Sequence, residues 1–344
     1  MLGVSLFANV GIGELLLPKK FQVVLANELI PKRSSFYSLN HPNTQILTGD
    51  ITNKQIFESL INIANQQKID FLIATPPCQG MSVAGKKQNN DPRNSLILSV
   101  IDFIKRIKPT YILIENVEGM LKTSINNLTI PLILKKELEP LNYIVNFQVL
   151  DTKDYSIPQS RRRVFFLIHK SNTKWNFPKK DTKIITVKEA IDHLPSLESG
   201  EKSNIPWHFA KIHNPNHILW MKHTKSGETA FNNPIYFPKK SNGEKIKGFS
   251  TTYKRIDPNK PCATITMCNG GISSQNNVHY GRLKEDNTYS DSRVLSILEL
   301  MIIMTIPINR FKIPENISDN FLREVIGEAV PPLIINKLLS SIIL

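Results

Sequence analysis

Residues 5–14 read SLFANVGIGE, an apolar strand that runs directly into a turn containing Gly11 and Gly13. Glycines let the backbone adopt unusual torsion angles and approach a ligand closely. The pattern fits a simple tight turn equally well, because the third glycine of the dinucleotide-binding fingerprint is absent. The residues at the ends of the next strands therefore decide between a ligand turn and a plain one.

Acidic residues stand at the ends of two of those strands. Glu28 closes the apolar run 21–27, and Gly49-Asp50-Ile51 stands at the third strand position. A carboxylate at Glu28 can accept hydrogen bonds from both hydroxyls of an adenosine ribose. Asp50 can accept from an adenine amino group while Ile51 packs on the ring. No P-loop lysine accompanies these turns, so they predict a nucleoside cofactor rather than a phosphate site.

The first 170 residues alternate short apolar runs with helical patterns. The expected strands are 4–8, 21–27, 71–74, 111–114, 143–149 and 164–169, and the expected helices are 53–66, 95–107 and 128–138. Strands that alternate with helices predict βαβ units and a parallel sheet. We therefore expect an α/β fold with a doubly wound, mostly parallel sheet, whose ligands bind at the carboxyl ends of the strands.

Positive charge is concentrated in the middle of the 344-residue chain. The net charge is +14, and residues 171–260 carry 16 Lys and Arg against 8 Asp and Glu, with five of the eight histidines. Such a segment favours a polyanionic partner, most often nucleic acid, although a basic solvated surface explains the charge alone equally well. This segment is loop-rich, which predicts a second, smaller domain over 171–292. Helical periodicity returns at 294–305, 319–326 and 333–343.

Composition excludes several other classes. Three cysteines cannot build a disulfide framework, which is typical of a reducing cytoplasm. No uncharged apolar stretch reaches about 18 residues, and the apolar start lacks a basic n-region and a cleavage site, so we expect neither a membrane span nor a signal peptide. His208, His213, His217 and His223 do not have zinc-ligand spacing, and we expect no metal.

The sequence PPCQ at 76–79 places a cysteine in a proline-stiffened turn after a predicted strand. A lone cysteine is usually a small core residue, but in such a loop Cys78 is a candidate nucleophile. The polar, glycine-bearing residues 80–93 have the composition of a mobile loop that closes over a substrate.

The sequence ENV at 115–117 follows the apolar run 111–114, and QSRRR at 159–163 precedes another strand. A carboxylate at Glu115 is costly to bury without a partner, and burial would raise its pKa, so that it could hold or donate a proton. A triple arginine is normally a solvated surface feature. Beside a buried strand, however, one of these arginines could reach a substrate.

The ordered motifs FAxxG, strand-end Glu, GDI, PPCQ, ENV and QxRxR resemble the cytosine-C5 DNA methyltransferase family of bacterial restriction–modification systems. The resemblance covers residues 6–168, resumes at 261–266 and 293–299, and ends with VIGEAVPP at 325–332. It implies an S-adenosylmethionine-dependent methyltransferase fold. The expected domains are a catalytic and cofactor-binding domain over 1–170 and 318–344, a target-recognition domain over 171–292, and a hinge over 293–317.

The resemblance also implies roles for individual residues. Cys78 would add to C6 of a flipped-out cytosine, Glu115 would contact N3 and the amino group, and Arg163 would hold O2 with Arg161 nearby. The cofactor-binding residues would be Phe7, Asn9, Gly11, Glu28, Asp50, Ile51, Pro77, Ala329 and Val330, and the DNA-binding residues Gln79, Ser82, Arg93 and Thr264. The implied partners are double-stranded DNA and a cognate restriction endonuclease system. We expect a monomer in a bacterial cytoplasm, associated with the nucleoid.

The chain departs from the family pattern in its cofactor motifs. Asn9 stands where the family has its first glycine, Ile12 replaces another glycine, and Leu29 takes the place of a stacking aromatic residue in some relatives. Glu328 occupies the asparagine position of GNAV, and the common arginine before Glu299 is missing. These changes concern cofactor affinity, because the nucleophile, acid and arginine positions are intact.

Three other functions compete with DNA methylation. A tRNA cytosine-C5 methyltransferase shares these motifs, but its CFT tripeptide is absent. A catalytically silent DNA-binding relative is disfavoured by the intact Cys78, Glu115 and Arg163. A nicotinamide-dependent dehydrogenase is disfavoured by the incomplete glycine fingerprint.

Overall fold

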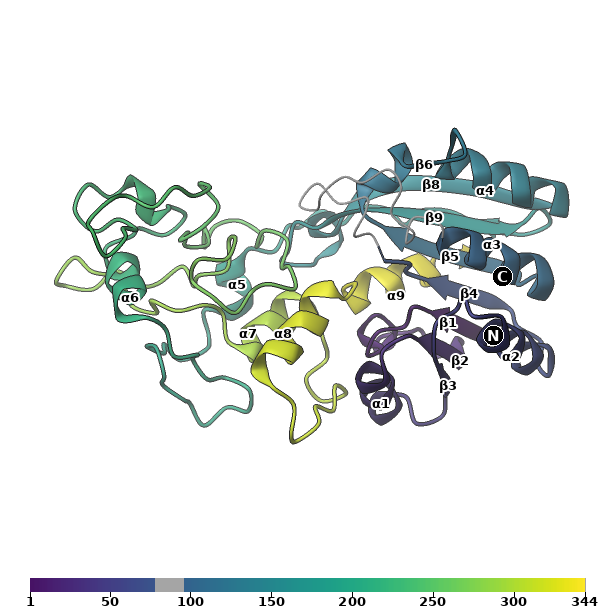
Figure 1. Cartoon of the computed structure of the whole chain (residues 1–344), viewed down its shortest axis with the longest axis horizontal. Coiled ribbons are helices and arrows are strands. Elements are labelled where there is room, and N and C mark those ends of the chain that lie inside the picture. Colours follow the sequence, from purple (N-terminus) through teal and green to yellow (C-terminus); the bar gives the residue numbers. More distant parts are fainter. Residues whose placement is uncertain (78–95, 344) are drawn as a thin grey trace.

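The computed structural model describes residues 1–77 and 96–343. Its two lobes are a large one built on a sheet and a smaller one made mostly of loops, with helices α7 and α8 between them (Figure 1). The strands are β1 (Leu2–Leu6), β2 (Gln22–Glu28), β3 (Gln45–Thr48), β4 (Phe71–Ala74), β5 (Tyr111–Asn116), β6 (Ser124–Ile125), β7 (Leu128–Thr129), β8 (Tyr143–Asp151), β9 (Arg162–Lys170), β10 (Lys174–Trp175) and β11 (Ile342–Ile343).

The α-helices alternate with the strands in the first part of the chain and gather at the end of it. They are α1 (Pro31–Asn40), α2 (Lys54–Asn65), α3 (Leu96–Ile107), α4 (Ile130–Leu138), α5 (Val187–Ile191), α6 (Pro215–Lys222), α7 (Ile297–Ile303), α8 (Asp319–Glu328) and α9 (Pro332–Ser340). The short 3₁₀ helices are η1 (Ile12–Glu14), η3 (Glu118–Lys122), η4 (Glu139–Leu141), η5 (Thr152–Tyr155) and η6 (Ala230–Asn232).

A seven-stranded sheet in the order β3-β2-β1-β4-β5-β9-β8 forms the large lobe. Strands β1 to β5 pair in parallel, whereas β9 is antiparallel to both of its neighbours. The reversal matters for function: because β9 runs backwards, its first residues lie at the edge where β1 to β5 end. The predicted doubly wound, mostly parallel sheet is confirmed.

Both faces of this sheet are covered, as the alternation of buried side chains requires. Ile112 and Ile114 of β5 pack with helices α2, α3 and α4 on one face. Tyr111 and Leu113 point to the other face, where they meet α9. Strand β5 is therefore apolar on both sides, as is typical of a sheet enclosed between two helical layers.

Some predicted elements differ in detail. The helix expected over 128–138 begins at Ile130, because residues 128–129 instead pair with β6 as strand β7. Strand β9 begins at Arg162, so the arginine run enters the sheet instead of preceding it. Helix α1 has no counterpart among the predicted elements, since it buries only Ser34, Phe36 and Tyr37 and has little apolar periodicity.

The segment 171–292 contains two kinds of structure. Its first residues form β10, which pairs with β11 at the end of the chain, and Trp175 packs in the core beside α9. A separate small core formed by Trp220, Met221, Tyr253 and Val278 with their neighbours lies further along. The division into catalytic, recognition and hinge domains remains a prediction.

Among the residues that the structure describes, no helix is long and apolar enough to cross a membrane.

Candidate active site

A cavity of about 1050 Å³ opens at the carboxyl edge of the sheet. Parallel strands end at the same edge, so the residues that come after them necessarily meet there. The predicted site residues among its lining are Phe7, Asn9, Glu28, Asp50, Ile51, Pro77, Glu115, Arg161, Arg163, Thr264, Ala329 and Val330. The structure thus gathers residues from the ends of β1 to β5, from the start of β9 and from the end of the chain around one space.

Glu115 is the penultimate residue of β5 and is buried, with 7% of its surface exposed. Its Oε1 lies 3.1 Å from Nε of Arg163, the second residue of β9. Burial raises the pKa of Glu115 above its ordinary value, and the nearby Arg163 and Arg161 oppose that rise. The carboxyl group is therefore poised to hold a proton more readily than an exposed glutamate would.

Arg161 lines the cavity but directs its guanidinium into the protein. Nη1 donates to the carbonyls of Ile265 and Gly327 at 3.0 and 3.1 Å, and Nη2 donates to the carbonyl of Glu328 at 3.3 Å. These bonds join the end of α8 to the segment around Ile265. Gly327 permits that approach, because a Cβ there would meet the carbonyl of Thr266 at 2.2 Å.

Glu28 ends β2 and has its carboxylate fixed by two backbone amides. The amide of Asn9 donates to one oxygen at 2.9 Å, and that of Ile30 donates to the other at 3.0 Å. The carboxylate lines the cavity and is thereby held in a defined orientation. These two hydrogen bonds join the turn after β1 to the turn after β2.

Asp50 lies beyond β3 and caps its own turn. Its Oδ1 accepts hydrogen bonds from the amide and hydroxyl of Thr52, both at 2.8 Å. Asn27, buried in β2, donates to the carbonyls of Leu47 and Gly49 and so fixes the preceding strand end. Sequence reasoning missed this role of Asn27, although an amide within an apolar strand is itself a signal of a buried hydrogen bond.

Gly11 does not lie among the cavity-lining residues. It has φ of +77°, and a Cβ would meet the ring of His41 at 2.3 Å. The His41 ring also hydrogen-bonds to the Gly11 carbonyl at 2.9 Å. Both the positive φ and the packing against Tyr37 and His41, at the end of helix α1, favour glycine at this position.

The turn after β4 is tied to its neighbours by Asn116 and Thr75. The Asn116 amide donates to the Pro76 carbonyl at 2.9 Å, and the Thr75 hydroxyl donates to the Phe7 carbonyl at 3.1 Å. The ENV and PPCQ motifs therefore touch directly, a contact that neither motif reveals alone. Cys78, Gln79, Ser82, Arg93 and the predicted loop 80–93 lie outside the described residues.

The segment 261–266 crosses the QSRRR motif. Residues Gln159 and Cys262 form a parallel bridge, and the Thr264 hydroxyl donates to the Ser160 carbonyl at 2.9 Å. Thr264 thereby reaches the cavity wall beside the arginines. Burial raises the pKa of the Cys262 thiol to about 12, which makes it an inert core cysteine.

Two departures from the family pattern, Asn9 and Glu328, are in contact with each other. The Asn9 side-chain amide donates to Glu328 Oε2 at 3.2 Å. Arg33 of α1 lies 2.8 Å from the same carboxylate and 2.6 Å from that of Glu324. Arg33 had no sequence signal, since only the fold brings α1 against α8.

Across residues 1–77 and 96–343, no group of three or more His, Cys, Asp or Glu side chains is arranged to hold a metal ion.

The fold and the cavity define an α/β enzyme of the methyltransferase type, and sequence comparison identifies its family. The family described as C-5 cytosine-specific DNA methylase matches residues 1–344. The chain therefore belongs to this family of DNA cytosine-5-methyltransferases, which confirms the resemblance noted in the sequence.

Individual relatives agree with this assignment. The chain is 46% identical to the type II methyltransferase M1.HgaI of Avibacterium volantium, over 99% of this chain and 98% of that protein. It is 28% identical to the type II methyltransferase M1.HphI of Haemophilus parahaemolyticus, over 94% of this chain and 81% of that protein. The solved structure of the methyltransferase EhMeth of Entamoeba histolytica superposes with a TM-score of 0.66 at 15% identity, covering 99% of this chain and 97% of the other. The structural similarity extends the agreement to the fold.

Proposed function

We propose that this enzyme transfers a methyl group from S-adenosylmethionine to C5 of a specific cytosine in double-stranded DNA, through covalent addition of Cys78 to a flipped-out base. The observation that carries the proposal is the ion pair between buried Glu115 and Arg163 at 3.1 Å, which lines the same cavity as Glu28 and Asp50. One end of the cavity thus suits a cytosine ring, and the other suits an adenosine.

The chemistry of the lining residues fits this cofactor. Glu28 and Asp50 offer carboxylate oxygens for the ribose hydroxyls and the adenine amino group, and Phe7, Ile51 and Pro77 offer apolar surface. Small-molecule pockets measure roughly 300–1,000 Å³. The cavity of about 1050 Å³ therefore has room for the cofactor together with a base. When bound, this cofactor supplies an electrophilic methyl group.

The residues of the chain perform the remaining chemistry. The Cys78 thiolate forms a bond to C6, and the C5–C6 π electrons move to make C5 nucleophilic. Glu115 stabilises the altered ring at N3 and the amino group, and Arg163 holds O2. After C5 is methylated, a base takes the C5 proton, the electron pair of that C–H bond re-forms the C5–C6 double bond, and the thiolate leaves.

A cytosine inside a stacked duplex cannot reach this cavity. Extruding it costs a few kcal/mol, which contacts with the DNA backbone must offset. The basic segment 171–292 is suited to those contacts and to reading base edges, because it carries much of the positive charge.

Bisulfite sequencing of DNA from cells that express the chain tests the proposal. We expect cytosines in one short sequence context to resist deamination by bisulfite. In cells that express Glu115→Gln, the same cytosines should be deaminated. Unmodified DNA, together with methylated tRNA from the same cells, would overturn the proposal in favour of the tRNA alternative.

A further inference from the structure

The Asn9–Glu328 contact joins two positions that are 319 residues apart and that both depart from the family pattern. At the first position the family has glycine, and at the second it has asparagine. Asn9 has φ of +49°, a left-handed conformation that glycine adopts freely and that asparagine tolerates better than most residues. The backbone at this turn thus keeps the shape that a glycine would allow, while the added side chain reaches α8.

Glu328 is a half-buried charged group, with 25% of its side chain exposed. Burial raises its pKa above the ordinary value, the carboxylates of Glu324 and Glu28 contribute to the rise, and Arg33 opposes it. A carboxylate there requires a cation and a donor, because an unpaired buried charge is costly. Arg33 supplies the cation, and the Asn9 amide supplies an additional donor.

The same turn supplies one of the two backbone hydrogen bonds that orient Glu28, the other being that of Ile30. The backbone amide of Asn9 donates to Glu28 Oε2 at 2.9 Å, while its side chain donates to Glu328. A continuous chain of contacts therefore runs from Arg33 through Glu328 and Asn9 to Glu28. All four residues line the cavity.

We propose that Asn9 and Glu328 form one compensated pair, which positions the Glu28 carboxylate toward the ribose of the cofactor. This inference rests on the proposed function and adds two positioning residues to it. The asparagine holds the turn that supplies one of the two backbone hydrogen bonds to Glu28, and the glutamate holds the asparagine. Asn9 favours cofactor binding only when Glu328 is present, and Glu328 favours it only when Asn9 is present.

Calorimetric titration of the full chain with S-adenosylhomocysteine tests this in a double-mutant cycle. The variants are Asn9→Gly, Glu328→Asn and the two together. We expect each single change to weaken binding by about fivefold or more, and the double change to weaken it no further than the worse single change. Glu328→Asn and the double variant both lack the ion pair between Arg33 and Glu328. The free energy lost with that ion pair is therefore the same in both and cancels in the cycle.

A second ligand separates positioning from general damage. In the unaltered protein, the analogue that lacks the ribose 2′-hydroxyl should bind more weakly than S-adenosylhomocysteine. Asn9→Gly should narrow that difference, since a misaligned Glu28 no longer recognises the hydroxyl. A merely structural role would weaken both ligands equally and would overturn the proposal.

The exposed pair Arg106–Glu58 provides the matched control. Its two hydrogen bonds measure 2.6 and 2.9 Å, and neither residue lines the cavity. The variants Arg106→Gln and Glu58→Gln should leave both affinities unchanged. If the double variant loses affinity by the product of the two single losses, the two residues act independently and the pairing is overturned. If the unaltered protein does not bind S-adenosylhomocysteine, the proposed function is overturned instead.

Discussion

Arg163 Nε lies 3.1 Å from Glu115 Oε1 because β9 runs antiparallel to β5, which brings the start of one strand beside the end of the other. In a wholly parallel sheet, an arginine at the start of a strand would lie at the opposite edge. The reversed strand thus supplies the cavity with a cation that the parallel strands do not.

Removing this cation should raise the pKa of Glu115 further. Burial already raises it, and Arg163 is the largest opposing influence. Arg163→Met should therefore move the Glu115 titration upward, measured by NMR of protein labelled at the glutamate carboxyl carbon. The control is Arg162→Met, because Arg162 is exposed and pairs with Glu118. An unmoved titration in Arg163→Met would contradict the assigned influence.

Cys78 should be the residue that forms the covalent adduct. DNA containing 5-fluorocytosine should trap the unaltered enzyme, because fluorine at C5 cannot leave as a proton does. Cys78→Ser should yield no adduct and lose essentially all methyl transfer while retaining cofactor affinity. Cys268→Ser should still be trapped, since this cysteine is exposed and is not one of the residues that line the cavity. Turnover of a tenth or more in Cys78→Ser would exclude covalent catalysis at this residue.

The acidic residues at the strand ends should determine cofactor affinity. Glu28→Ala and Asp50→Ala should each weaken S-adenosylmethionine binding by about 1–3 kcal/mol, the cost of a lost buried or charge-assisted hydrogen bond. Calorimetry on both variants measures this, with Glu58→Ala as a control because Glu58 is exposed on α2. Unchanged affinity in both variants would remove their proposed roles.

Much of the cavity could be predicted because its residues lie at strand ends. Glu28, Asp50 and Glu115 each come at the end of an apolar run or shortly after it, and parallel strands bring such positions to one edge. The order of these motifs also resembles one family, and that resemblance added Arg163 and Thr264 to the predicted site. The sheet and its acidic strand ends could thus be predicted from local pattern, and other lining residues only from the resemblance.

The long-range contacts could not be predicted in this way. Arg161 and Arg163 belong to the same run of three arginines. Arg161, however, donates hydrogen bonds to the carbonyls of Gly327 and Glu328, more than 160 residues away. Arg33 meets Glu328 only because α1 packs beside α8. The sequence around Gly11 has the pattern of a ligand turn, but His41 explains the glycine, and that contact depends on a helix with no clear apolar pattern.

The buried histidine His279 should make stability depend on pH. Burial lowers its pKa to about 4, with Glu299, Asp291, Arg293 and Arg255 as its charged neighbours. An unfolded histidine takes up its proton at about pH 6.5. Between these values the unfolded chain binds more protons, so stability falls as pH decreases from about 6.5 toward 4.

Urea unfolding at several pH values measures this effect. His279→Asn should flatten the dependence in that range, whereas the change His193→Asn at an exposed histidine should leave it as it is. If the free energy of unfolding of His279→Asn changes with pH as steeply as that of the unaltered protein, His279 is not the source of the pH dependence.

The loop-rich lobe should control which DNA is methylated, while the large lobe performs the transfer. Replacing 171–292 by the same segment of a relative should transfer the recognition sequence. The stretch 239–247 of this lobe contains a single acid, Glu244, which pairs with Lys240, and four exposed lysines: Lys239, Lys240, Lys245 and Lys247.

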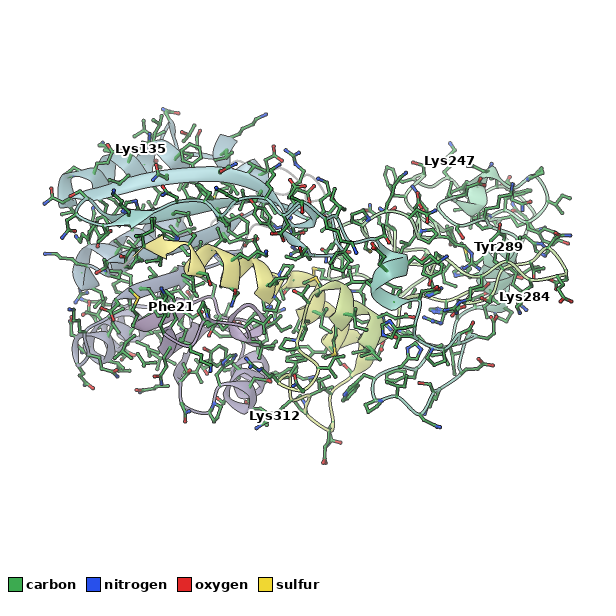
Figure 2. All side chains as sticks on the ribbon, turned by 180° about the vertical axis from the view of Figure 1, so that it is seen from behind. Phe21, Lys135, Lys247, Lys284, Tyr289 and Lys312 are labelled. Carbon is green, nitrogen blue, oxygen red and sulfur yellow. The ribbon has the colours of Figure 1, made fainter. Side chains whose placement is uncertain are left out.

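Phosphate contacts by these lysines should be visible in the salt dependence of binding. Figure 2 places Lys247 on the smaller lobe and Lys135 on the opposite one, which makes them a test and a control. Each neutralised phosphate contributes about one unit to the slope of log affinity against log salt. Lys247→Ala should weaken binding to all sequences and flatten that slope by roughly one unit, measured between about 50 and 200 mM salt, while Lys135→Ala should change neither. A chimera that keeps the original recognition sequence, or binding that is insensitive to salt, would contradict this division of labour.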